Sequence, residues 1–215
     1  LRVALRRFDA NSFDEGDFIR FGVHEQPDLA RAVLRRKAEY LAGRITARAE
    51  LRRFGLGDTQ IGTGTMRAPV WPESIVGSIS HSIDHVAAVV ADRRDFASLG
   101  LDVEPLMPLE LATSLAATIG AELEFGRVAP FACNQAYATT LLFSLKESYF
   151  KCISWRICRY LDFLEVEVNR MMPGHCVVGP SPSCVTPEGV LPAARAYFSI
   201  DGECGVISLV LDEDR

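Results

Sequence analysis

Two carboxylates, Asp102 and Glu104, stand two residues apart at the end of the apolar segment ASLGLDVE (97–104). In a β-strand, residues i and i+2 project from the same side, so both carboxylates would point in one direction. Neighbouring carboxylates repel each other unless a cation or a proton relieves them. Hard oxygen ligands favour Mg²⁺, which takes its remaining ligands from water and phosphate. The pair therefore predicts either a magnesium site or an exposed strand end before a turn at Pro105.

A second set of polar residues lies in FSLKESYFK (143–151), among side chains suited to a packed helix. On a helical period, Ser144, Glu147 and Lys151 share one face. This face is either a solvated stripe, with one Glu–Lys pair worth about 0.3 kcal/mol, or a polar surface turned into a cleft. Lys146 sits about 100° around the helix from Glu147 and would either reach a phosphate from the rim or be solvated.

Ser80, His81 and Ser82 follow the strand-like segment VGSIS (76–80). With Asp84, the pair His81 and His85 suggests a zinc site, but that spacing needs a helix to aim both rings at one ion. Because this region has the pattern of strand and turn, a histidine and hydroxyls that hydrogen-bond a phosphate fit better.

A basic helix is predicted after Pro27, over residues 28–54. Its cationic side chains are Arg31, Arg35, Arg36, Lys37, Arg44, Arg48, Arg52 and Arg53. Such clustering in an acidic protein is typical of a site for an anionic partner, and equally of a solvated helix surface.

Composition excludes several classes of function. The 215 residues carry a net charge of −5 and a pI near 5.4, which argues against a nucleic-acid binder. The longest apolar runs, such as VAAVVA (86–91), are too short to span a bilayer, and LRVALRRF at the start lacks the apolar core of a signal peptide. The six cysteines form no CxxC pair and indicate thiols of a reducing compartment. We therefore expect a cytoplasmic protein with no membrane or nucleic-acid partner.

The order of predicted elements indicates an α+β fold of two similar halves that meet near residues 101–106. Strands 76–80, 85–91 and 97–104, separated by short turns, suggest an antiparallel meander. The remaining predictions are a strand at 1–8, a loop at 55–74, helices at 109–125 and 134–155, a strand at 160–169, a connection at 171–193, and a final hairpin formed by 194–200 and 205–211.

In this order, the three polar segments resemble the Sfp-type 4′-phosphopantetheinyl transferases, and in particular their EntD-like branch, the enterobactin synthase component D type. The family pattern of G-x-D-x-E followed by W/F-S-x-K-E-x-x-x-K matches GLDVE (100–104) and FSLKESYFK (143–151). The segment ISHS (79–82) matches upstream, and RKAEYLAGR (36–44) and RAPVWP (67–72) are similar to features of that branch. The resemblance covers roughly residues 30–155.

The resemblance implies two pseudo-symmetric α/β halves, residues 1–103 and 104–215, with the active site between them. It implies Mg²⁺-dependent transfer of 4′-phosphopantetheine from coenzyme A to a serine of an apo acyl, aryl or peptidyl carrier protein, with release of 3′,5′-ADP, by a monomer that serves siderophore or nonribosomal peptide synthesis. The alternative is a non-catalytic module that binds coenzyme A or a nucleotide.

Carried over residue by residue, the resemblance implies that Asp102, Glu104 and Glu147 hold Mg²⁺ and that Lys151 contacts the pyrophosphate. Glu147 is the best candidate base for the carrier serine, directly or through a metal-bound water.

At the coenzyme A end, the resemblance implies that Ser80 and His81 contact phosphates. Arg44 and Arg67 look suited to the 3′-phosphate and adenine.

Overall fold

The computed structural model describes residues 1–157, 159–185, 191–202 and 205–213. The chain divides into two compact units, Leu1–Asp95 and Phe96–Arg215, which we call the first unit and the second unit and describe separately. The division therefore precedes the strand that carries Asp102, whereas the sequence placed it between residues 103 and 104. Both units combine helices with an antiparallel sheet, which confirms the α+β class.

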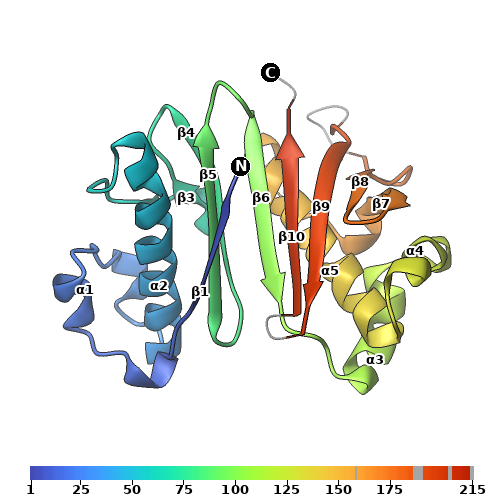
Figure 1. Cartoon of the computed structure of the whole chain (residues 1–215), viewed down its shortest axis with the longest axis horizontal. Coiled ribbons are helices and arrows are strands. Elements are labelled where there is room, and N and C mark those ends of the chain that lie inside the picture. The colour runs from blue at the N-terminus through green and yellow to red at the C-terminus, as the bar shows by residue number, and fades with distance from the viewer. Residues whose placement is uncertain (158, 186–190, 203–204, 214–215) are drawn as a thin grey trace. The chain divides into compact units, whose positions relative to one another are not determined.

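A three-stranded antiparallel sheet of order β1-β5-β4 forms the first unit (Figure 1). Its strands are β1 (Val3–Arg7), β4 (Ile75–His81) and β5 (His85–Asp92). The helix α2 (Leu34–Leu51) packs against this sheet. The remaining elements are short: η1 (Ala10–Ser12), α1 (Asp17–Arg20), η2 (Pro27–Leu29), η3 (Arg52–Phe54), η4 (Thr65–Arg67) and the pair β2 (Gly62–Thr63) and β3 (Pro69–Val70).

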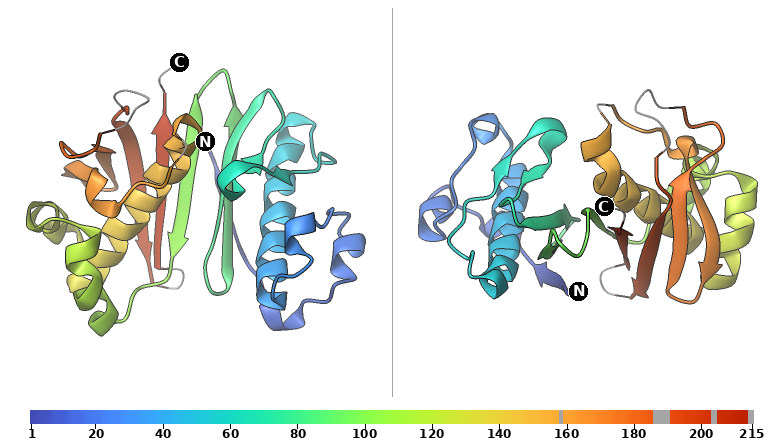
Figure 2. Two further views of the ribbon diagram at one scale, coloured as in Figure 1. Left: turned by 180° about the vertical axis from the view of Figure 1, so that it is seen from behind. Right: turned by 90° about the horizontal axis from the view of Figure 1, so that it is seen from above.

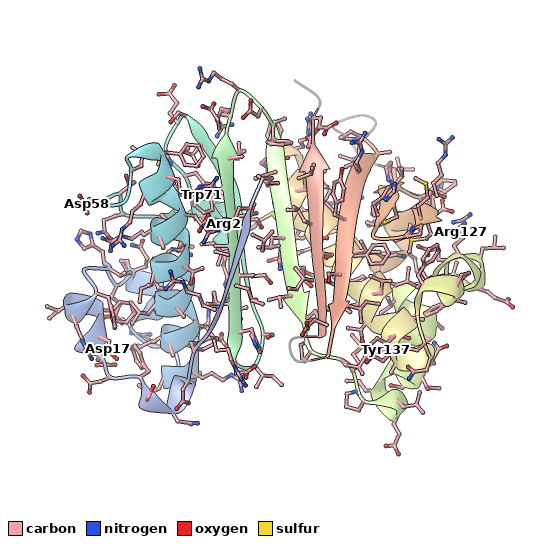
Figure 3. The ribbon with its side chains drawn as sticks, in the orientation of Figure 1. Arg2, Asp17, Asp58, Trp71, Arg127 and Tyr137 are labelled. Carbon is pink, nitrogen blue, oxygen red and sulfur yellow. The ribbon has the colours of Figure 1, made fainter. Side chains whose placement is uncertain are left out.

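The predicted basic helix is shorter than residues 28–54, because Val33 is extended and separates η2 from α2. The inner face of α2 buries Ala47 and Leu51 against Ile75, Ala88 and Val90 of the sheet. Trp71, labelled in Figure 3, covers β4 at Gly77, where a Cβ would lie 2.8 Å from the indole ring.

The second unit has a five-stranded antiparallel sheet of order β6-β10-β9-β8-β7. Its strands are β6 (Ser98–Glu104), β7 (Val166–Met172), β8 (His175–Pro180), β9 (Ala194–Asp201) and β10 (Gly205–Asp212). The helices are α3 (Leu109–Ile119), α4 (Glu122–Val128) and α5 (Gln135–Ile153), with the short turns η5 (Ala129–Phe131), η6 (Ser154–Arg156) and η7 (Phe163–Glu165). Figure 2 shows α5 crossing one face of the sheet, where it packs on β6 and β10 more than on the other strands.

The side chain of Asn134 caps α5 by accepting a hydrogen bond from the backbone N–H of Tyr137. Leu145 and Tyr149 of α5 are fully buried in a core that includes Val168, Val178 and Val210 of the sheet. The predicted helix at 134–155 is confirmed within two residues at each end.

Several predictions about the strands and helices were wrong. The strand predicted at 160–169 begins only at Val166, directly after η7. The segments 76–80, 85–91 and 97–104 do not form one meander: β4 pairs with β5, but β6 pairs with β10 in the other sheet. The helix predicted at 109–125 is divided at Gly120, whose backbone is extended, into α3 and α4. The connection predicted at 171–193 contains β8, which a turn at Pro173–Gly174 joins to β7; Gly174 has φ 75°, and Pro-Gly is a frequent centre of such turns.

Gly100 lets α5 lie directly on β6. A Cβ at this position would lie 2.6 Å from the backbone nitrogen of Cys152 and closer still to the carbonyl oxygen of Ser148. Both are backbone atoms of a packed helix, so a side chain at position 100 could be accommodated only by moving α5 as a whole. The glycine therefore sets the distance between the helix and the strand that carry the polar residues.

Four cysteines are free thiols: Cys152 and Cys176 are buried, Cys184 is partly exposed and Cys133 is exposed. Cys158 and Cys204 lie outside the described residues. Over the described ranges, no helix combines the length and hydrophobicity that crossing a membrane requires.

Candidate active site

The acidic pair of β6 and the polar face of α5 meet in the second unit. Lys151 Nζ donates to Asp102 Oδ1 at 2.6 Å, and Asp102 is almost completely buried. Gly100, Asp102 and Glu104 occupy every second position of β6, so all three lie on the face of the sheet that α5 covers. The structure thus joins the two segments through one ion pair, and the solvated-stripe interpretation of FSLKESYFK was wrong for Lys151.

The electrostatics of this cluster favour a cation. Burial, followed by the charge of Asp102, raises the pKa of Glu104 to about 8. Burial also raises the pKa of Glu147, with Lys151 opposing the shift and Asp102 reinforcing it. Lys151 is the cation that opposes both pKa shifts. When all three carboxylates are ionised, its one positive charge faces three negative charges.

The donor set fits Mg²⁺ chemically, since it consists of carboxylate oxygens that have lost much of their water. Among the described residues, no three His, Cys, Asp or Glu side chains converge closely enough to hold a metal ion. The ion pair with Lys151 engages one of the predicted ligand atoms, Asp102 Oδ1. Asp102, Glu104 and Glu147 therefore remain a predicted ligand set.

Lys146 lies outside this cluster, and both alternatives predicted for it were wrong. Its ammonium is buried and donates to Glu124 at 2.9 Å and to the carbonyl oxygen of Phe163 at 3.0 Å. Glu124 also accepts from the backbone N–H groups of Ala121 and Val168, at 3.0 and 2.9 Å. Burial lowers the pKa of Lys146, while Glu124 opposes that shift. The pair joins α4, α5, η7 and β7 inside the core.

A small cavity of about 90 Å³ opens beside Glu147. Its walls are mostly apolar, and Tyr160 stacks on Phe150 at a ring-centroid distance of 5.5 Å. The remaining lining residues are Lys146, Leu161, Asp162, Phe163 and Val166. The cavity is therefore a small hollow with mostly apolar walls next to the carboxylate.

In the first unit, His81 contacts the basic helix α2. Arg36 Nη1 lies 2.8 Å from His81 Nε2, and Glu39 Oε2 lies 3.7 Å from His81 Nδ1. Because a guanidinium can only donate, Nε2 accepts in this contact, and a neutral ring carries its proton on Nδ1. Glu39 also pairs with Arg35 and Arg36, so cations and one carboxylate surround the ring.

Ser80 does not share the side of the strand that presents His81. Successive residues of β4 project from opposite faces, and Ser80 is buried whereas His81 is half-buried. The alternative of a zinc site formed by His81, Asp84 and His85 was wrong for the described chain, which brings no such group together. His85 Nδ1 instead contacts Asp84 Oδ1 at 2.7 Å.

Arg44 and Arg67 occupy very different environments. Arg44 is buried, stacks on Tyr40, and donates to the carbonyl oxygens of Ile61 and Gly62 at 2.8 and 3.0 Å. Arg67 is exposed in the turn between β2 and β3, where it and Met66 have φ angles of 61° and 53°. Two successive non-glycine residues in the left-handed region are strained. Arg44 thus anchors the base of the hairpin whose tip presents Arg67.

Sequence reasoning missed several residues of these networks. Glu124 and Ser208 were not identified, although each contacts α5 at FSLKESYFK. Arg36 and Glu39 were visible only as part of a charged helix. Glu39 lies four residues after Arg35 and three after Arg36, which are the i, i+4 and i, i+3 spacings of helical ion pairs.

Comparison with known proteins identifies the class. A model of the 4'-phosphopantetheinyl transferase N-terminal domain matches residues 24–91, and a model of the 4'-phosphopantetheinyl transferase superfamily matches residues 98–179. The chain belongs to the 4'-phosphopantetheinyl transferase superfamily, as the following relatives also establish.

Three relatives illustrate the similarity. Enterobactin synthase component D of Escherichia coli (strain K12) is 37% identical over 164 residues, which cover 76% of each chain. Enterobactin synthase component D of Salmonella austin is 39% identical over 160 residues, covering 73% of this chain and 63% of the relative. The 4'-phosphopantetheinyl transferase Svp of Streptomyces mobaraensis is 38% identical over 146 residues, covering 67% of this chain and 58% of Svp. The chain thus spans less than two thirds of the length of some of its relatives.

Proposed function

We propose that this protein transfers 4′-phosphopantetheine from coenzyme A to a serine hydroxyl of an apo carrier protein, with Mg²⁺, and releases 3′,5′-ADP. The observation that carries the proposal is the joining of GLDVE and FSLKESYFK by the Lys151–Asp102 ion pair. Family membership and relatives named 4'-phosphopantetheinyl transferase support it. Relatives named enterobactin synthase component D favour siderophore synthesis as the pathway.

The chemistry needs a base for the serine and positive charge for the phosphate. Glu147 suits the first role because its raised pKa brings the carboxylate closer to neutral pH, where a general base works best. Lys151 suits the second, since its ammonium can stabilise negative charge as it develops on the pyrophosphate oxygens. Asp102 orients that ammonium through the 2.6 Å contact.

Asp102, Glu104 and Glu147 would hold Mg²⁺, which supplies charge neutralisation at the pyrophosphate when bound. The raised pKa values of Glu104 and Glu147 support this assignment, because buried carboxylates of this kind gain most from a divalent cation.

Coenzyme A phosphates would contact His81 and the exposed Arg67, whereas the buried Ser80 faces the other side of β4 and is left out of this proposal. Arg44 is already bonded to the carbonyl oxygens of Ile61 and Gly62, so we assign it to holding the hairpin that carries Arg67.

The carrier protein would dock largely through apolar contacts, because a net charge of −5 opposes an acidic partner. Leu109 and Leu111 of α3 and Leu123 of α4 are exposed apolar side chains of the second unit. We propose the region of α3 and α4 as the docking site, with the enzyme acting as a monomer.

The test incubates the protein with coenzyme A, Mg²⁺ and several purified apo carrier domains and weighs the carriers by mass spectrometry. A gain of one phosphopantetheine group is expected, and Asp102→Ala and Glu147→Ala should lose most of it. Glu167→Ala is the control, since Glu167 pairs with Arg127 away from this cluster.

If no carrier gains the group, the proposed transferase activity is refuted. Calorimetric titration with coenzyme A would then test the alternative of a non-catalytic binding module, whose affinity should not depend on Mg²⁺ or on Glu147.

A further inference from the structure

A hydroxyl on β10 lies next to the carboxylate cluster. In the register of β6 and β10, Ser208 pairs directly with Asp102. Directly paired residues project from the same face of a sheet, so Ser208 and Asp102 both point toward α5. Ser208 is fully buried, and its contacts show what it does there.

Ser208 bonds two successive turns of α5. Its Oγ lies 2.8 Å from the carbonyl oxygen of Ser144, 2.8 Å from Ser144 Oγ and 2.9 Å from Ser148 Oγ. A serine hydroxyl has one proton and two acceptor lone pairs. Ser208 therefore donates to α5 while Ser144 Oγ donates to it, and the three hydroxyls form one buried network.

These bonds and the ion pair hold α5 at adjacent points of the sheet. Ser208 holds Ser144 and Ser148, and its strand neighbour Asp102 holds Lys151. Ser144 and Lys151 are seven residues apart, about two helical turns. A shift of the helix by one residue would rotate its side chains by about 100° and separate Lys151 from Asp102.

The interface has little spare volume. Ser144 and Ser148 are fully buried, and at Gly100 the backbone of α5 lies against β6 without space for a Cβ. A larger residue at 208 would lift α5 from the sheet, and a residue without a hydroxyl would leave Ser144 Oγ without this acceptor. Both the small side chain and the hydroxyl at position 208 are therefore needed to seat α5 on the sheet.

We propose that Ser208 is a positioning residue for the transfer reaction: it fixes the rotation and height of α5 over β6, and so aligns Lys151 and Glu147 with Asp102. The catalytic part of this inference rests on the proposed function. The geometric part does not, so the two are measured separately.

The catalytic arm compares three substitutions. Ser208→Ala removes the hydroxyl, Ser208→Thr keeps it and adds a methyl group, and Ser208→Val has the shape of threonine without the hydroxyl. We expect kcat to fall about 10-fold in Ser208→Ala and about 100-fold in Ser208→Val, because displacing reacting groups by about 1 Å has effects of this size. Ser208→Thr should recover part of the loss seen in Ser208→Val, and KM for coenzyme A should stay within twofold throughout.

Ser98→Ala is the matched control. Ser98 is a buried serine on β6 whose hydroxyl contacts α5 at Cys152 Sγ, 3.2 Å away, and Asp212 at 3.4 Å. The substitution deletes a buried hydroxyl at the start of β6, away from Asp102 near the end of that strand. We therefore expect kcat to stay within twofold of that of the unsubstituted protein.

The geometric arm measures the coupling between Lys151 and Asp102 in urea unfolding, through Lys151→Met, Asp102→Asn and the double variant. The cycle is run in the unsubstituted protein and in the Ser208→Ala background, which removes no packing volume beyond the hydroxyl. We expect Ser208→Ala to remove more than half of the coupling and Ser98→Ala to leave it intact.

An unchanged coupling in the Ser208→Ala background would overturn the inference, as would a kcat within twofold for both Ser208→Ala and Ser208→Val. If the unsubstituted protein modifies no carrier, the proposed function fails, and the coupling still decides whether Ser208 positions α5.

Discussion

Lys151 Nζ lies 2.6 Å from Asp102 Oδ1, so the second unit neutralises an almost completely buried carboxylate with a cation from the adjacent helix. The contact links the last motif residue of α5 to the first of the two carboxylates of β6. It also sets two proposed roles of Asp102 in competition, because the carboxylate that orients Lys151 is the one assigned to Mg²⁺.

Lys151→Met separates these roles. Without the ammonium, transfer should slow by about 100-fold, because charge stabilisation at the phosphate is lost. Mn²⁺ used as a paramagnetic probe should bind at least as tightly as before, because Asp102 is released from the ion pair. Weaker Mn²⁺ binding in Lys151→Met would contradict this division of roles.

The stability of the metal-free protein should fall as pH rises. Burial gives Glu104 a pKa of about 8 against an ordinary value of 4.5, so the folded state holds this proton more tightly than the unfolded state. The stabilisation is fully present below pH 4.5 and is lost as pH rises through 8. Urea unfolding in EDTA from pH 5 to 9 should show the decline, and Mg²⁺ should reverse it at pH 8. Glu104→Gln should have a flatter profile, and an equal slope would argue against Glu104 as the source.

Gly100→Ala should destabilise the protein by about 3 kcal/mol, because the added Cβ meets backbone atoms of α5 and overpacking of this kind displaces whole elements. Gly126→Ala is the matched control in α4, where no atom lies within 4 Å of the new Cβ. It should stabilise by about 0.5 kcal/mol through helix propensity. Thermal unfolding of both variants measures the difference, and similar effects would show that α5 has room to move.

Lys146→Met should cost about 3–5 kcal/mol, because it leaves the Glu124 carboxylate buried without its cation. Arg127→Met provides the comparison: Arg127, labelled in Figure 3, pairs with Glu167 at 2.6 Å, with both side chains partly exposed. Its loss should cost about 1 kcal/mol or less. Equal losses of unfolding free energy in the two variants would contradict the buried role of Lys146.

The local part of the site could be predicted from the sequence. Strand spacing correctly placed Asp102 and Glu104 on one side, and helical spacing placed Lys151 on the face of α5 that turns toward Asp102. These predictions succeeded because the period of a single element determines them. The catalytic, metal and coenzyme A roles of these residues stay predictions.

The non-local part could not be predicted. Ser208 reaches Asp102 only because β10 pairs with β6, and the hydrophobic pattern of a strand does not specify its partner. The same limit produced the wrong meander. Lys146 looked like a surface charge because its partner Glu124 is 22 residues away in a helix that the prediction had fused to α3.

The pairing of β6 with β10 also imposes an order of events during synthesis. Asp102 and Glu104 leave the ribosome roughly a hundred residues before the strand that seats α5, and chains grow from the N-terminus at about 5–20 residues per second. Until β10 is made, β6 lacks the strand with which it pairs, and α5 lacks its hydrogen bonds to Ser208. A nascent chain stalled before residue 205 would therefore hold every residue of both motifs and still lack the assembled site.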